Sequence, residues 1–268
     1  MQILRKGSNG IDVEKWQTFL RGLISNSIVL ITGTFDDKTD KETKSFQGKK
    51  GLVPDGVVGS KTLAVALQSG YPLMEDPACD QNGPNWPPRP IVAPLNYSDR
   101  EKLFGKFLYI SSPTYGNPEG ITITDNWLSN IIQVPIPQLS GVSGVNKSTM
   151  IPFHALLAPQ LIKLFQAWHD AGLMYLIITW GGSWNPRFIR GSRTILSNHA
   201  FGTAFDINVQ WNRLGTQPAL NGATGSVREL VDIAYEHGFY WGGWFGYSLN
   251  GTPGNRTDGM HFEAYQIC

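Results

Sequence analysis

The sequence predicts an α+β protein in three parts: a small three-helix domain at residues 1–70, a proline-rich linker at 71–98, and a larger domain with an antiparallel sheet at 99–268. In the first part, apolar residues recur three and four positions apart, as on helix faces. Between them, seven prolines at 72–94 exclude continuous helices and central strands. In the last part, helical patterns alternate with short β-rich runs, which favours a compact α+β fold.

The first part is predicted to hold three helices. Apolar periodicity indicates helices at 13–23, 39–46 and 60–67, the last of which begins at a serine suited to capping. A glycine turn followed by a helix start occurs at both 33–39 and 56–62.

Several runs in this part resemble the three-helix peptidoglycan-binding module of cell-wall hydrolases. They are Leu4–Val13, then Phe35-Asp36 with Phe46-Gln47, and above all the run Gly51-Leu52-Val53-Pro54-Asp55-Gly56-Val57-Val58-Gly59. The resemblance implies that bacterial peptidoglycan is a partner of the chain.

The elements expected in the last part follow one another as helix, strand, motif, helix, strand and motif. Apolar stripes predict helices at 159–171 and 226–237, the second with a capping box formed by Ser226 and Glu229. Strands are predicted at 173–179, 239–241 and 261–265. No clear element is predicted between 110 and 158.

Composition excludes some functions and leaves others open. The net charge is +1 and no basic block is interleaved with aromatic residues, which argues against nucleic-acid binding. No apolar run reaches the roughly 18 residues of a membrane span, and the first residues lack a signal-peptide core. Cys79 and Cys268 are consistent with either a disulfide or free thiols. So few thiols exclude a cysteine-based zinc site.

Two distant stretches, Ser197–Asp206 and Asp258–Glu263, together indicate one metal site. His199, Asp206 and His261 supply two imidazoles and a carboxylate, which is the ligand set of a catalytic zinc site with an open position. Asp258 is a spare acid that can accept a proton from a metal-activated water. The other histidines, His154, His169 and His237, have structural explanations near helix ends.

The paired motif Ser-x-His-x-x-Gly-x-Ala-x-Asp and Asp-x-x-His-Phe-Glu resembles the zinc peptidases that cut peptidoglycan stem peptides. That family includes D-alanyl-D-alanine carboxypeptidases and dipeptidases and the L-alanyl-D-glutamate endopeptidases of phage lysins, and it shares its fold with the hedgehog signalling domain. The similarity covers residues 175–265. It implies that His199, Asp206 and His261 bind Zn²⁺ and that Asp258 is the general base. The run Trp241-Gly242-Gly243-Trp244 also matches the endopeptidase-like branch.

Such enzymes hold the substrate with an arginine upstream of the first histidine. Arg187 is the first candidate because it follows the Gly181-Gly182 turn most closely, and Arg190 and Arg193 are rivals. Glu263 is either an acceptor that orients a metal ligand or a structural residue. The cleft wall or the core is expected to take the aromatic residues Trp180, Trp184, Trp241, Trp244 and Tyr247.

Together these features predict an endolysin-like peptidoglycan hydrolase that cleaves stem peptides as an L-alanyl-D-glutamate endopeptidase with a Zn²⁺ cofactor. The alternatives are a D-alanyl-D-alanine carboxypeptidase and a non-catalytic wall-binding protein with a structural zinc. We expect a monomer that is made in the cytoplasm, reaches the cell wall through a phage holin pore, and needs neither nucleic acid nor a membrane span.

Overall fold

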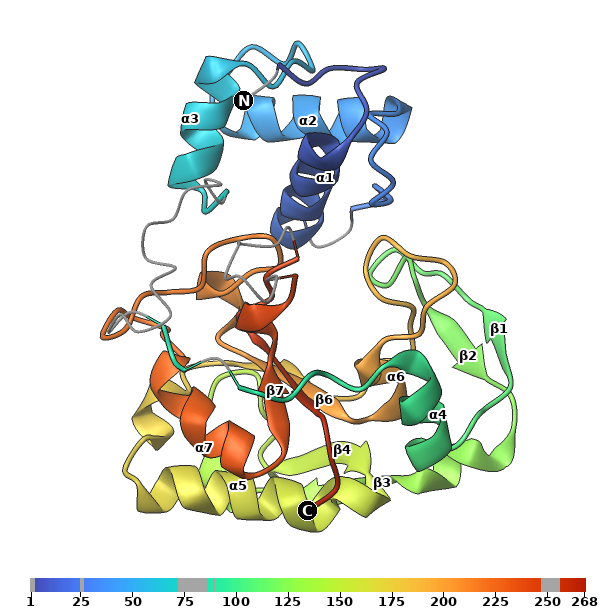
Figure 1. Ribbon diagram of the computed structural model, residues 1–268, viewed down its shortest axis with the longest axis vertical. Helices are drawn as coiled ribbons and strands as arrows, with labels where there is room; N and C mark the ends of the chain where they lie inside the picture. The colour runs from blue at the N-terminus through green and yellow to red at the C-terminus, as the bar shows by residue number, and fades with distance from the viewer. Residues whose placement is uncertain (1–2, 25–26, 72–85, 89, 247–255) are drawn as a thin grey trace.

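The computed structural model describes all residues except 1–2, 25–26, 72–85, 89 and 247–255. Two separate hydrophobic cores lie within the described part of the chain, one among the N-terminal helices and one in the rest of the molecule. The predicted fold class is confirmed: a helical domain precedes an α+β domain (Figure 1). No helix in the described ranges has both the length and the apolar character that crossing a membrane requires.

The N-terminal domain is built from α1 (Ile11–Leu23), α2 (Asp37–Lys49) and α3 (Ser60–Gln68). Its core is aromatic: Trp16 and Phe19 of α1 pack on Phe46 of α2, with ring centroids 5.7 and 5.5 Å from it. Asp36 caps α2 by accepting a hydrogen bond from the Thr39 amide. Capping by Ser60 was predicted wrongly, because Gly59 holds the cap position of α3 and no side chain caps it.

The motif residues Gln47 and Gly56 stabilise the turn that precedes α3. The Gln47 side chain accepts from the Gly56 amide at 2.9 Å and donates to the Val57 carbonyl at 3.0 Å. Gly56 has a φ of 79°, a left-handed conformation that glycine adopts without strain. The run 51–59 is therefore fastened to α2 by one buried amide.

The C-terminal domain contains four α-helices and eight strands in its described residues. The helices are α4 (Tyr97–Phe104), α5 (Ala158–Asp170), α6 (Asn198–Phe201) and α7 (Val231–Glu236). The strands are β1 (Tyr109–Ser111), β2 (Ile121–Ile123), β3 (Ile131–Pro135), β4 (Met150–His154), β5 (Trp180–Gly182), β6 (Ala204–Ile207), β7 (Phe239–Trp241) and β8 (His261–Ala264). Two antiparallel pairs, β1-β2 and β3-β4, accompany a four-stranded antiparallel sheet of order β5-β6-β8-β7.

The central pair of this sheet fixes where the functional residues point. In the β6–β8 register, Phe205 lies opposite Phe262 and Asp206 lies opposite His261. The two phenylalanines stack in the core at 5.4 Å and contact Trp168 of α5. Side chains alternate along a strand, so Asp206 and His261 point to the sheet face that α5 does not cover.

Two predicted elements differ from the structure. The apolar run 173–179 is not a strand but contains the 3₁₀ turn Met174–Leu176, because Asn208 Oδ1 accepts from the Ile178 and Thr179 amides that a strand would use. The helix predicted from 226 begins only at Val231, after a 3₁₀ turn. The Ser226 hydroxyl donates to the Glu229 carboxylate, so these two residues do not form a capping box.

A tryptophan from the predicted linker belongs to the second core. Trp86 is 4% exposed and packs on Trp241 and Trp244, with centroids 5.5 and 5.1 Å away. The guanidinium of Arg228 lies over the Trp86 ring. Trp241 and Trp244 are thus core residues rather than walls of a cleft. Cys79, Tyr247 and most of the linker lie outside the described residues.

Candidate metal centre

Three short elements bring the predicted ligands together. The one-turn helix α6 carries His199 and is capped by Ser197, whose hydroxyl accepts from the His199 amide. It ends at Gly202, where a φ of 63° turns the chain directly into β6. Asp206 lies on β6 and His261 on β8, so a tight turn and one cross-strand pair assemble the cluster.

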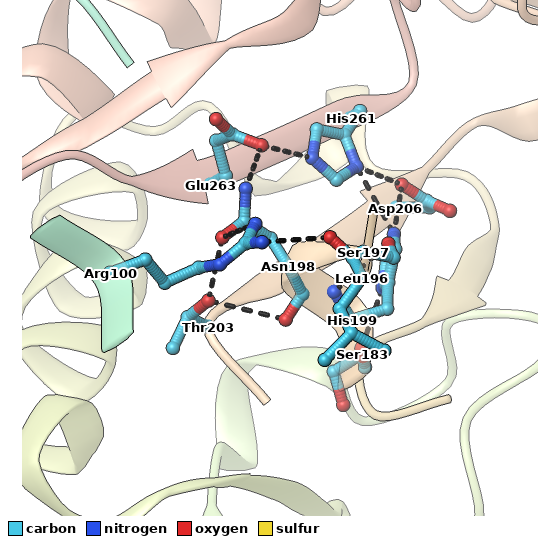
Figure 2. Close-up of polar contacts among 10 residues, drawn as sticks. All are labelled: Arg100, Ser183, Leu196, Ser197, Asn198, His199, Thr203, Asp206, His261 and Glu263. Carbon is cyan, nitrogen blue, oxygen red and sulfur yellow. Dashed lines mark hydrogen bonds and ion pairs between the residues drawn. The ribbon is translucent and has the colours of Figure 1, made fainter. Parts of the chain in front are cut away.

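The three side chains converge on one point, as Figure 2 shows. His199 Nε2 is 3.1 Å from His261 Nδ1. Asp206 Oδ1 lies 3.2 Å from His199 Nε2 and 3.0 Å from His261 Nδ1. All three residues are buried, and they make the one group of potential metal ligands found among the described residues.

The outer partner of each imidazole fixes its tautomer. His199 Nδ1 lies 2.6 Å from the Ser183 carbonyl oxygen, which can only accept, so Nδ1 carries the proton and Nε2 faces the cluster with its lone pair. His261 Nε2 lies 2.9 Å from the Glu263 carboxylate, so its Nδ1 faces the cluster in the same way. Two lone pairs and a carboxylate oxygen then meet with no donor between them. This arrangement fits a cation.

A chain of buried polar contacts supports His261 from behind (Figure 2). Glu263 also accepts a hydrogen bond from Asn198 Nδ2, and Asn198 Oδ1 accepts from Arg100 on α4 at 3.1 Å. Arg100 donates a second bond to the Leu196 carbonyl at 2.8 Å. An acceptor that orients a metal ligand was one of the two roles expected for Glu263. Arg100 was not expected here, because nothing in the sequence links it to a motif about a hundred residues away.

The electrostatics of the cluster agree with a site built for positive charge. Burial opposes ionisation of Asp206, yet the two imidazoles hold the pKa of this carboxyl well below its usual range. Burial lowers the pKa of His199. It also opposes protonation of His261, but hydrogen bonds to Asp206 and Glu263 outweigh it and raise the pKa of His261 to about 10. Without a metal ion, His261 would thus carry a proton on both ring nitrogens, between the carboxylates of Asp206 and Glu263.

Asp258 lies beside the cluster and is held by its backbone. Its amide donates to the Gly242 carbonyl at 2.9 Å, and its carbonyl accepts from the His261 amide at 3.1 Å. A Cβ on Gly242 would come within 2.5 Å of the Asp258 carbonyl oxygen, which explains a glycine in the Trp241–Trp244 run. Burial raises the pKa of Asp258 to about 6. Within the described part of the chain, its buried Oδ1 has no hydrogen-bond partner.

A cavity of about 330 Å³ opens beside these residues. It is lined by His199, Asp258 and His261 together with three arginines, Arg187, Arg190 and Arg256. Burial lowers the pKa of Arg187 to about 10, a value at which it is still a cation at neutral pH. Arg193 is not in this lining, and its guanidinium donates to the Pro118 carbonyl instead. Arg256 was not singled out from the sequence.

Comparisons with known families match a segment of each domain. Residues 190–264 match the family model described as D-alanyl-D-alanine carboxypeptidase, and residues 9–65 match the model described as putative peptidoglycan binding domain. The N-terminal domain is thus similar to peptidoglycan-binding domains, and part of the C-terminal domain is similar to D-alanyl-D-alanine carboxypeptidases. No curated protein matches the sequence. The carboxypeptidase-like match spans the three metal-ligand candidates, Asp258 and Arg190.

The other histidines of the C-terminal domain have no part in the cluster. His154 is 2% exposed and its Nδ1 accepts from the Leu156 amide at the start of a 3₁₀ turn. His169 lies in the last turn of α5 and His237 follows α7. These positions agree with the structural roles expected from the sequence.

Proposed function

We propose that this protein is a zinc-dependent peptidase that hydrolyses the stem peptides of peptidoglycan. The observation that carries the proposal is the convergence of His199, Asp206 and His261 with their acceptor atoms facing one point. Asp258 lines the same cavity as His199 and His261, and it has a buried oxygen with no hydrogen-bond partner among the described residues. A non-catalytic zinc site has no use for such a carboxylate.

The donor set supports zinc over a harder cation. Two imidazole nitrogens and one carboxylate oxygen form the kind of three-ligand set that leaves catalytic zinc a further position for water or substrate. A zinc ion bound there would supply Lewis acidity, polarising the scissile carbonyl and lowering the pKa of an attacking water toward about 7.

The other steps are assigned to side chains of the protein. Asp258 accepts a proton from the attacking water, whose oxygen forms a bond to the carbonyl carbon. The carbon–nitrogen bond then breaks, and Asp258 returns the proton to the leaving amine. Arg187 and Arg190 hold the carbonyl oxygen or a neighbouring carboxylate of the substrate, where each donor is worth about 3–4 kcal/mol in the transition state. Ser183 and Glu263 keep the imidazoles oriented.

We propose the bond between L-alanine and D-glutamate as the one that is cleaved. The resemblance of the Trp241–Trp244 run to the endopeptidase-like branch supports this choice. Asp258 supports it too, because many of those endopeptidases have an aspartate as the base where the carboxypeptidases have a glutamate. The second candidate is removal of a terminal D-alanine. The description of the matching family and the three arginines in the cavity, which suit a free carboxylate, favour that alternative.

The two-domain architecture supports a polymeric substrate. We propose residues 1–70 as the binding domain, 71–98 as the linker and 99–268 as the peptidase domain of a monomer. Binding of the first domain to the wall raises the local concentration of the second at its substrate.

Digestion of purified cell walls tests the proposal. Zinc-loaded protein should clear a wall suspension, and mass spectrometry of the digest should find new L-alanine carboxyl ends and D-glutamate amino ends. Free D-alanine would instead support the carboxypeptidase. Zinc binding without any new chain end would refute the enzyme and leave a wall-binding protein with a structural zinc.

A further inference from the structure

The segment that carries Arg187 and Arg190 is fastened to a neighbouring strand region through Glu119. The Ile121 amide donates to the Pro186 carbonyl at 3.1 Å, and the Phe188 amide donates to the Glu119 carbonyl at 3.0 Å. The Glu119 carboxylate then accepts from the Gly191 amide at 3.2 Å. Glu119 therefore holds the 186–191 segment with both its backbone and its side chain.

The charge of Glu119 is balanced by the other domain. Arg21, in the last turn of α1, contacts Glu119 Oε1 through Nη2 at 2.5 Å, and the two side chains are only 3% and 4% exposed. Removing one member of such a buried pair leaves the other charge buried without a partner, which is strongly destabilising. The Arg190 guanidinium also reaches the carbonyl of Arg21 at 3.5 Å. Arg21 of the N-terminal domain thus contacts both Glu119 and Arg190.

A second loop of the cavity rests on the same helix. Leu214 lines the cavity, and its carbonyl oxygen lies so close to α1 that a Cβ on Gly22 would be 1.6 Å from it. The adjacent Gly215 meets Thr18 of α1, and a Cβ there would be 2.9 Å from its methyl carbon. Contacts this close leave no room for a side chain between the helix and the loop. In Figure 1, α1 runs from the N-terminal helices toward the C-terminal domain.

We infer that α1 of the peptidoglycan-binding domain supports two wall segments of the proposed catalytic cavity, and that Arg21 is a positioning residue that acts through Glu119 on the segment bearing Arg187 and Arg190. The N-terminal domain then does more than retain the enzyme on the wall. It sets the activity even on a soluble peptide that carries no glycan and cannot engage a wall-binding surface.

The test uses full-length variants and a soluble L-alanyl-D-glutamyl stem peptide without glycan, and its activity arm rests on the proposed function. Arg21→Gln removes the partner of Glu119, and Gly22→Ala forces α1 away from Leu214. Their matched controls are Lys41→Gln, at an exposed site of α2, and Gly48→Ala, where a Cβ meets no atom within 4 Å.

We expect both α1 variants to lose about 10- to 100-fold in kcat/KM, the cost of misplacing a substrate-holding group. The loss should include kcat, because the arginines are proposed to hold the carbonyl oxygen in the transition state. Zinc content should not change, because the candidate ligands lie on α6, β6 and β8. The controls should stay within about twofold of wild type, and Arg21→Lys, which keeps the charge, should recover part of the loss.

Amide hydrogen exchange supplies a readout that does not depend on activity. The Gly191 and Phe188 amides should exchange faster in Arg21→Gln than in Lys41→Gln. Wild-type rates of peptide cleavage in both α1 variants, or unchanged exchange at these amides, would overturn the inference. If Arg21→Gln does not fold, Gly22→Ala decides, since each domain has a core of its own. A wild-type protein that cleaves no stem peptide refutes the proposed function, and exchange alone then decides the inference.

Discussion

Replacing Glu263 by glutamine should weaken zinc binding without removing any metal ligand. One carboxylate oxygen, Oε2, accepts from both His261 Nε2 and Asn198 Nδ2. The carbonyl oxygen of a glutamine can take the same place and keep both hydrogen bonds. The substitution therefore removes a negative charge from behind His261 and leaves the shape of the site intact.

The size of the effect follows from the strength of that contact. A hydrogen bond to a charged group contributes about 1.5–3 kcal/mol and a neutral one about 0.5–1.5 kcal/mol, so losing the charge should cost about 1–1.5 kcal/mol. Each 1.4 kcal/mol corresponds to a factor of ten in affinity, so Kd for zinc should rise roughly tenfold. This lies at the lower end of the 10- to 100-fold range typical of residues that orient metal ligands.

Competition against a chelator of known zinc affinity measures this change at fixed pH. Glu236→Gln is the matched control, because Glu236 is an exposed acid on α7 outside the cavity lining. Equal zinc affinities for the Glu263→Gln variant and the control would refute the view that Glu263 tunes His261. A complete loss of zinc binding would show that the Glu263 carboxylate is needed to maintain the structure of the site, and does not act only through its charge.

Three further outcomes are expected. Asp258→Asn should abolish hydrolysis of stem peptides while zinc content stays at the wild-type level; full activity would remove Asp258 from the mechanism. Gly242→Ala should push the Asp258 backbone away and lower kcat, whereas Gly116→Ala, where a Cβ meets nothing within 4 Å, should not; equal rates would contradict this. Burial lowers the pKa of His154, so the unfolded state binds more protons below about pH 6.5 and the free energy of unfolding should fall as pH falls through that value. Denaturant titrations from pH 7 to 5 should show a slope that His154→Gln reduces, and parallel slopes would refute it.

Long periodic patterns predicted the fold best. The stripe containing Trp16 and Phe19 and the one containing Leu164 and Trp168 each gave a helix, because one face of each meets a core. The run 173–179 misled the prediction, since a short apolar run does not reveal that Asn208 takes its backbone donors. The three-residue strand β1, whose side chains are all exposed, left no pattern to detect.

The sequence predicted those residues of the candidate site that lie close together along the chain. His199 and Asp206 share one turn, and Asp258 and His261 share another, so spacing along the chain reported their proximity. Arg100 could not be found this way, because it approaches from α4 and its polar contacts form only in the folded chain. The same holds for Arg21 and Glu119, which lie in different domains. The boundaries of the three predicted parts stay predictions.

Because Asp206 and His261 are paired across β6 and β8, the metal site forms only when these two strands are in the correct register. A shift of one residue in this pairing would turn one of the two side chains to the opposite face, toward Trp168 and the phenylalanines. An ion that binds only the aligned strands stabilises them by mass action and leaves misaligned forms without that gain. Metal supplied during refolding should therefore raise the yield of correctly paired sheet, and not merely restore chemistry to a finished fold.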